Sequence, residues 1–184
     1  MTRAAGDDDE AHAKRDASDG EVHIVLSLGS NIDRERNLRR ALVRIEARFG
    51  RLERSPVYET AAVGFDGPPF YNLVVGFRSD DAVARVRDQL RRIEADAGRG
   101  RAHARKVFEN RALDIDILLY GDHDLRAAGY NIPRDEIARC AYVLKPLADL
   151  YPDLALPRGG ETMLNLWRRM RRAEQAMVEV EFAL

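Results

Sequence analysis

The chain has 184 residues, 45% of them hydrophobic, a length and composition typical of one domain with an ordinary core. Its formal net charge of −1 gives no overall attraction to nucleic acid or to an anionic membrane. The single cysteine, Cys140, excludes an internal disulfide and favours a reducing compartment, the cytoplasm, and no apolar run approaches the roughly 20 residues that span a bilayer.

The N-terminal residues 1–20 contain no Leu, Ile, Val or aromatic residue. This composition excludes a secretory signal and predicts a disordered tail. We therefore expect a single domain at 21–184. Its first elements are a strand at 22–28 and a helix at about 33–49, whose apolar residues fall on one face.

Four more elements and two connections complete the first part of the domain. In chain order they are a strand at 51–60 that Pro56 interrupts, a loop at 61–69, a strand at 70–77, a helix at 83–97, a basic connection at 99–110 and a strand at 112–121. The order β-α-β-β-α-β predicts an α+β, ferredoxin-like core with a mainly antiparallel sheet and both helices on one face. A less regular C-terminal extension follows, with a last helix at about 161–177 and a short strand in "VEVEF".

The strand in "RALDIDILLYGD" carries two carboxylates, Asp114 and Asp116, between alternating apolar residues. The apolar positions are Leu113, Ile115, Ile117 and Leu119. Since residues two apart in a strand share a face, the two carboxylates lie side by side and require a nearby cation. That cation is either an arginine such as Arg111 or Mg²⁺, which proteins hold with one or two carboxylates plus substrate phosphates. The strand alone favours neither of these interpretations. The four scattered histidines do not indicate zinc.

The connection that leads into this strand is rich in Arg and Lys, whose charges suit a polyphosphate bound with magnesium. A solvated basic loop is the alternative, and sparse aromatic residues disfavour a nucleic-acid surface. There is no G-x-x-x-x-G-K-[ST] or G-x-G-x-x-G motif, so any nucleotide is held without a P-loop. On the strand at 70–77, Asn72 and Phe70 share a face that could bind a flat heterocycle or form an ordinary strand surface.

Five segments together resemble one enzyme family. They are "LSLGSN", "SPVYETAAVGFDGPPFYN", "RRIEADAGR", "RALDIDILLYG" and "VLKPLADLYPDLALP". In this order they are similar to 6-hydroxymethyl-7,8-dihydropterin pyrophosphokinase, over about residues 22–157. The resemblance implies a ferredoxin-like fold and an ATP-dependent diphosphotransferase that moves pyrophosphate from ATP to the hydroxymethyl group of a reduced pterin, releasing AMP, in folate biosynthesis.

The resemblance also implies roles for individual residues. Two Mg²⁺ ions would be bridged by Asp114 and Asp116, and the catalytic arginines would be Arg99 and Arg111. The pterin would be bound by Thr60, Val63, Phe70, Asn72 and Tyr142. ATP would be bound by Glu94, Arg101, Ile117, Arg134 and Arg139. The expected partners are therefore small molecules, ATP and the pterin, with no membrane or nucleic acid, and we expect a monomer.

Three positions depart from the family pattern. Asn110 replaces a proline before the Asp114 strand, Arg134 replaces a histidine, and Cys140 replaces an arginine. These departures affect the ATP side of the expected site and keep two alternatives open. One is a related enzyme with another pterin or alcohol as acceptor; the other is a non-catalytic ferredoxin-like binding module.

Overall fold

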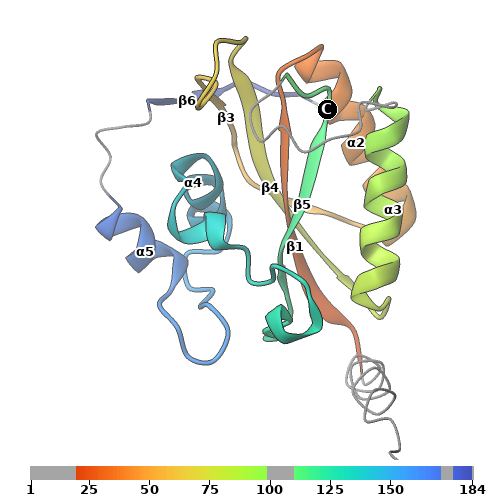
Figure 1. Ribbon diagram of the computed structural model, residues 1–184, viewed down its shortest axis with the longest axis vertical. Helices are drawn as coiled ribbons and strands as arrows, with labels where there is room; N and C mark the ends of the chain where they lie inside the picture. The colour runs from red at the N-terminus through yellow and green to blue at the C-terminus, as the bar shows by residue number, and fades with distance from the viewer. Residues whose placement is uncertain (1–19, 99–109, 171–175, 184) are drawn as a thin grey trace, which may run out of the picture.

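A mixed sheet-and-helix domain is seen in the computed structural model, which describes residues 20–98, 110–170 and 176–183 (Figure 1). Its six-stranded sheet has the order β5-β1-β4-β3-β6, with β2 also paired to β4, and each of these pairings is antiparallel. The strands are β1 (Val22–Ser30), β2 (Glu53–Arg54), β3 (Val57–Thr60), β4 (Phe70–Ser79), β5 (Asp114–Tyr120) and β6 (Met177–Val180). The predicted α+β, ferredoxin-like core is confirmed.

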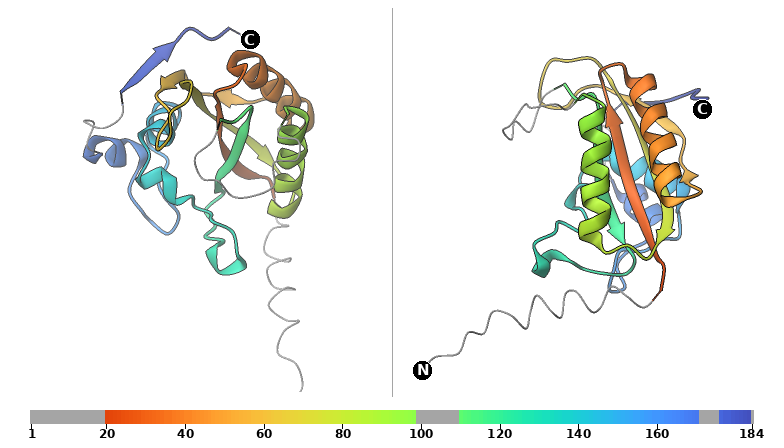
Figure 2. Two further views of the ribbon diagram at one scale, coloured as in Figure 1. Left: turned by 45° about the horizontal axis from the view of Figure 1, so that its top comes forward. Right: turned by 90° about the vertical axis from the view of Figure 1, so that its right-hand side faces the viewer.

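Two helices cover one face of the sheet, as predicted (Figure 2). They are α2 (Arg34–Phe49) and α3 (Val83–Asp96). Their apolar stripes pack on the alternate residues of the strands that face them, because side chains two apart in a strand share a face. The large apolar side chains that the two helices bury are Leu38, Leu42, Ile45, Val86, Leu90 and Ile93. This layer fixes which face of β5 remains for polar side chains.

The opposite face is covered by the C-terminal extension, which is more regular than the sequence predicts. Two short 3-10 helices, η1 (Arg126–Ala128) and η2 (Asp135–Ala138), precede α4 (Ala141–Leu150), and α5 (Met163–Arg169) follows. Helix α4 and part of α5 bury a second apolar core against β1, β4 and β5. The helix α4 is hard to predict because Pro146 lies inside it. The sheet is therefore covered on both faces.

Two details of the predicted elements are wrong. The last helix ends at Arg169 rather than near residue 177, because the chain turns extended at Met170 and Met177 already begins β6. The alternation in β5 also stops at Leu119, which packs in the second core. A register shift between β1 and β5 at Val25 causes this change of face. The split of the second strand at Pro56 into β2 and β3 is as expected.

Tyr151, at the end of α4, attaches that helix to the sheet. Its hydroxyl group contacts the carboxylate of Glu53 on β2 and lies 3.1 Å from the Nε2 atom of His23 on β1. The close approach is possible because Gly76 of β4 has no side chain beneath the tyrosine ring. No helix within the described ranges is long and apolar enough to cross a membrane.

Candidate active site

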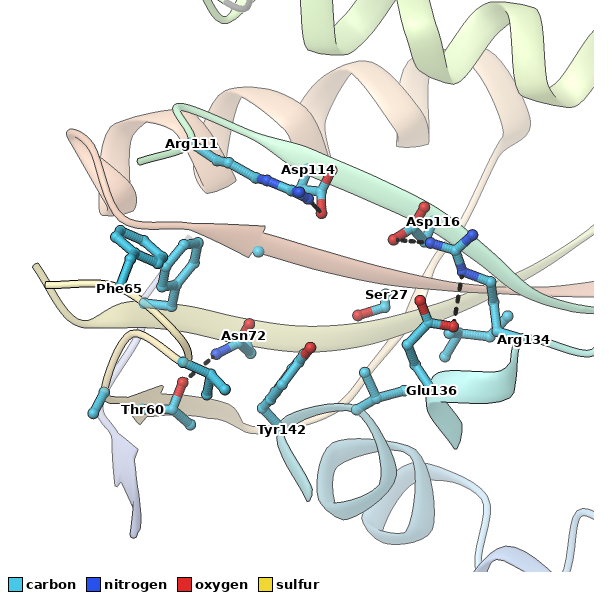
Figure 3. A pocket seen from close by; sticks show the side chains of 16 residues that line it. Ser27, Thr60, Phe65, Asn72, Arg111, Asp114, Asp116, Arg134, Glu136 and Tyr142 are labelled. Carbon is cyan, nitrogen blue, oxygen red and sulfur yellow. Dashed lines mark hydrogen bonds and ion pairs between the residues drawn. The ribbon is translucent and has the colours of Figure 1, made fainter. Parts of the chain in front are cut away.

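A row of small residues beside β5 leaves room for the two carboxylates. On the neighbouring strand β1, Ser27 lies opposite Asp116 and Gly29 lies opposite Asp114. One strand further, Asn72 lies opposite Gly29. A Cβ atom on Gly29 would come within 3.1 Å of the Asn72 Oδ1 atom. The sheet therefore has a hollow surface here, with acidic groups at one end and an amide at the other (Figure 3).

Each carboxylate contacts an arginine. Arg111 forms an ion pair with Asp114, and the Arg134 Nη2 atom lies 2.6 Å from Asp116 Oδ2. Burial raises the pKa of Asp116, and the nearby Asp114 raises it further, while Arg134 acts in the opposite direction. The sequence predicts a nearby cation that is either an arginine or Mg²⁺. The structure places an arginine beside each carboxylate. Their charge only partly compensates the burial of Asp116.

The first of two cavities next to these groups, the inner cavity, has a volume of about 230 Å³. Its wall includes all five residues that the sequence assigns to a pterin, namely Thr60, Val63, Phe70, Asn72 and Tyr142. The Asn72 amide donates a hydrogen bond to Thr60 Oγ1 at 2.8 Å, which orients it. Tyr142, from the first turn of α4, projects into the cavity (Figure 3). The inner cavity thus joins an aromatic and an amide surface to the carboxylates.

The second, the outer cavity, lies between α3 and β5 and measures about 410 Å³. Its wall includes Glu94 and Ile117, two of the residues that the sequence assigns to ATP. The buried Glu94 carboxylate accepts a hydrogen bond of 2.9 Å from the Ile115 N–H group, which connects α3 to β5. The Arg87 guanidinium lies 5.0 Å from the centre of the Tyr130 ring. Cationic, aromatic and apolar groups together suit a nucleotide.

Four side chains line both cavities and form a shared wall: Arg111, Asp114, Asp116 and Arg134. A molecule in the inner cavity and one in the outer cavity would therefore both reach the same carboxylates and guanidinium groups. This arrangement is suited to moving a charged group from one molecule to the other, since the arginines can neutralise it on either side.

Three predicted residues remain: Arg99, Arg101 and Arg139. Arg99 and Arg101 lie outside the described residues, with most of the basic connection. Arg139 directly follows η2, in a turn at the protein surface. Its side chain is exposed and lines neither cavity. Its assignment to ATP on sequence resemblance has no support from its position. Of the predicted tail, only Gly20 is described.

Sequence reasoning missed several wall residues. They are Ser27, Phe65 and Glu136 in the inner cavity and Arg87 and Tyr130 in the outer one. Phe65 lies in the predicted loop and packs edge-on against Phe70, with ring centres 6.3 Å apart. An aromatic residue in a Gly- and Pro-rich loop was a usable signal. Glu136 is only two residues after Arg134, but the sequence did not show that η2 begins here and that both side chains line the inner cavity.

Asn31, directly after β1, joins three segments next to the shared wall. Its amide nitrogen donates to Asn110 Oδ1 at 2.8 Å and to the Pro68 carbonyl at 3.2 Å. Its Oδ1 atom accepts a 2.7 Å bond from the Arg111 N–H group. Since the side chain is almost fully buried, these bonds hold the backbone from which Arg111 extends. Asn110, which departs from the family pattern, takes part in this contact.

Asn31→Ala is expected to lower kcat by about 10- to 100-fold, because a small displacement of Arg111 is costly in a site that works by positioning. The fold should survive, as measured by thermal unfolding. Asn165→Ala, an amide exposed on α5, is the matched control and should leave kcat unchanged. A kcat for Asn31→Ala within twofold of the unmodified enzyme would contradict this role.

The donor set of the shared wall fits a magnesium ion that a second molecule helps to hold. Asp114 and Asp116 are half-buried and both belong to the shared wall. Burial and the repulsion between the two negative charges favour the binding of a further positive charge beside them. In the part of the chain that the structure describes, no group of three or more His, Cys, Asp or Glu side chains could hold a metal ion. Magnesium is commonly bound by one or two carboxylates plus substrate phosphates and water, so the wall suits a metal–phosphate complex.

Paired carboxylates and arginines between two small-molecule cavities are the groups that enzymes use to transfer phosphoryl groups. The comparisons with known proteins define the class further. The sequence pattern of 7,8-dihydro-6-hydroxymethylpterin-pyrophosphokinase (HPPK) matches residues 25–152. The chain belongs to this family.

Individual relatives agree with the family match. The chain is 35% identical over 133 residues to the 2-amino-4-hydroxy-6-hydroxymethyldihydropteridine pyrophosphokinase of Porphyromonas gingivalis, covering 70% of this chain and 90% of that one. It is 34% identical over 146 residues to the enzyme of the same name from Pseudomonas aeruginosa, covering 74% and 85%. The resemblance inferred from the sequence, including an ATP-dependent pyrophosphokinase of folate biosynthesis, is therefore confirmed.

Solved structures show the same fold at lower identity. A Plasmodium falciparum HPPK-DHPS A437G structure with STZ-DHP superposes with a TM-score of 0.63 at 14% identity, over 81% of this chain. The wild-type structure with STZ-DHP gives a TM-score of 0.61 at 15% identity, over 84%. This chain spans less than half of either of those longer chains, 45% and 42% respectively.

Proposed function

We propose that this chain transfers pyrophosphate from ATP to the hydroxymethyl oxygen of 6-hydroxymethyl-7,8-dihydropterin, with the pterin in the inner cavity and ATP in the outer one. The observation that carries this assignment is the shared wall, where Asp114, Asp116, Arg111 and Arg134 border both cavities. The β- and γ-phosphates would lie along this wall, with AMP leaving on the outer side.

On the pterin side, the inner cavity supplies stacking surfaces and an amide. Phe70 and Tyr142 would contact the two faces of the pterin ring, and Asn72 would hydrogen-bond its edge, with Thr60 and Val63 beside it. The bond from Asn72 to Thr60 fixes which way the amide faces, so the edge of the ring meets oriented polar atoms. Burial raises the pKa of Tyr142, aided by the neighbouring Cys140, so its hydroxyl group stays protonated and can donate a hydrogen bond.

Asn72→Ala is expected to raise the KM for the pterin by roughly 10- to 100-fold, because the ring edge loses its partner inside a buried site. ATP affinity should stay within twofold, since Asn72 lines only the inner cavity. Steady-state kinetics with each substrate varied in turn separates the two effects. An unchanged pterin KM would show that the pterin binds elsewhere.

On the nucleotide side, Glu94 and Ile117 would border ATP, and Arg134 and Arg111 would contact its phosphates. Two further roles rest on the sequence resemblance alone. Arg99 would be a second catalytic arginine, and Arg101 would bind ATP. Asp114 and Asp116 would hold two Mg²⁺ ions, which supply charge neutralisation to the phosphates when bound. The chain's own part is to hold the acceptor hydroxyl and the phosphates in line and to neutralise the charge that develops between them.

One assay separates this function from its alternatives: purified chain with ATP, magnesium and 6-hydroxymethyl-7,8-dihydropterin, measured for AMP. AMP formed with this pterin supports the proposal. AMP formed only with another pterin or alcohol would mean that this other compound is the acceptor substrate. A chain that forms no AMP with any acceptor but binds RNA or protein would be a binding module. We further propose a monomer acting in the cytoplasm, in line with its single free cysteine, and size-exclusion chromatography tests the first point.

A further inference from the structure

Arg134 reaches Asp116 from a segment that is attached to the same strand. Its backbone N–H group donates a 3.0 Å hydrogen bond to the carbonyl of Leu118 on β5, just after Asp116. The side chain then extends along the wall, and its Nη2 atom lies 2.6 Å from Asp116 Oδ2 (Figure 3). The Arg134 side chain is three-quarters covered, so the pair is partly shielded from solvent. Arg134 thus pairs with one of the two carboxylate oxygens of Asp116.

The guanidinium group is incompletely satisfied in this position. Its Nε atom is buried and makes no hydrogen bond, although Glu136 Oε2 lies 3.5 Å away. That Glu136 oxygen is likewise buried without a hydrogen bond. A buried donor that makes no hydrogen bond costs free energy, so an acceptor closer to Arg134 would be stabilising. A phosphate in the outer cavity, which Arg134 also lines, would be such an acceptor.

We propose that Arg134 is an internal counterion that blocks the metal position at Asp116 until a nucleotide arrives. The inference rests on the proposed function, because it takes Asp116 as a metal ligand. One carboxylate oxygen cannot donate its charge fully to both a guanidinium group and Mg²⁺, and the two cations repel each other. The phosphates of ATP attract the guanidinium group away from Asp116, and the freed oxygen then binds the metal.

This exchange makes metal and nucleotide binding cooperative. Metal alone has to displace Arg134 from Asp116 without offering the guanidinium group another partner. With ATP present, the displaced guanidinium group pairs with a phosphate. This new contact largely offsets the free-energy cost of separating Arg134 from Asp116. Because coupling between two ligands is reciprocal, the metal also strengthens nucleotide binding. Without nucleotide, the protein should therefore bind divalent cations more weakly than two adjacent carboxylates would without an arginine beside them.

The test is the affinity of the nucleotide-free protein for Mn²⁺, measured from the electron paramagnetic resonance signal of the free ion. Arg134→Gln is expected to bind Mn²⁺ about tenfold more tightly than the unmodified protein, within the range usual for coupled sites. Arg134→Ala, measured in the same way, replaces it if the glutamine variant does not fold. Arg44→Gln is the matched control, because it removes an equal charge from a pair with Asp96 on the helical face. It should leave Mn²⁺ affinity unchanged.

Two results would overturn the inference: an unchanged Mn²⁺ affinity, or a weaker one, which would mean that Arg134 orients Asp116 for the metal. The double variant Arg134→Gln, Asp116→Asn should lose the increase in Mn²⁺ affinity. This loss would show that the more tightly bound Mn²⁺ ion lies at Asp116. A separate arm tests the proposed function. Calorimetry of the unmodified protein with a non-hydrolysable ATP analogue should show tighter binding when Mg²⁺ is present than when it is absent. If Mg²⁺ does not strengthen that binding, the metal assignment itself fails, whatever Arg134→Gln does.

Discussion

Asp116→Asn should lower AMP formation by about 10³-fold at saturating magnesium, equivalent to ~4 kcal/mol of activation free energy. The amide keeps the size of the side chain but removes the negative charge that would hold the metal and its phosphates. The carboxylate is only partly exposed and lies in the wall common to both cavities. An unchanged rate would defeat the assignment of Asp116 to the metal. The measurement is the initial rate of AMP release.

Two variants define how specific that loss is. Asp114→Asn should cause a loss of similar size, since both carboxylates border the same wall. Asp122→Asn is the control, because this exposed residue follows β5 in a turn, and its variant should keep full activity. Equal losses in all three variants would indicate a general effect of lowering the negative charge rather than a local site.

Gly76→Ala is expected to lower the free energy of unfolding by about 2–3 kcal/mol, the cost of overpacking a well-packed region. In a domain of this size, that corresponds to a fall in Tm of about 5–10 °C. A Cβ atom at this position would overlap the Tyr151 hydroxyl oxygen and come within 2.8 Å of His23 Nε2 and 2.9 Å of Tyr151 Cζ. Tyr151 would have to leave the sheet and lose its contacts with His23 and Glu53. Circular dichroism during heating measures the change.

A double variant tests the cause of this loss. Combining Gly76→Ala with Tyr151→Leu removes the ring that the new methyl group meets. The two changes should therefore destabilise the protein by clearly less than the sum of their separate effects. If the effects simply add, Tyr151 is not the group that the Cβ atom displaces, and the strain lies elsewhere in β4. Because α4 carries Tyr142 at its other end, the same loss should weaken pterin binding.

Local patterns in the sequence determined the parts of the site that depend on one strand. Alternation along β5 places Asp114 and Asp116 on one face, and the same rule places Asn72 beside Phe70 on β4. The β-α-β-β-α-β order determined the sheet and its two helices on one face. The two strand predictions hold because side-chain direction repeats every second residue wherever the strand has no register shift.

The tertiary structure alone decided which residues meet across the sheet. The second helical layer, the change of face at Leu119 and the place of Tyr142 in the inner cavity depend on how the C-terminal extension packs on β1, β4 and β5. The pairing of Arg134 with Asp116 depends on the backbone bond to Leu118 and on the direction of η2. Contacts between segments far apart in the chain arise from burial of the whole apolar surface, which no short pattern of residues encodes.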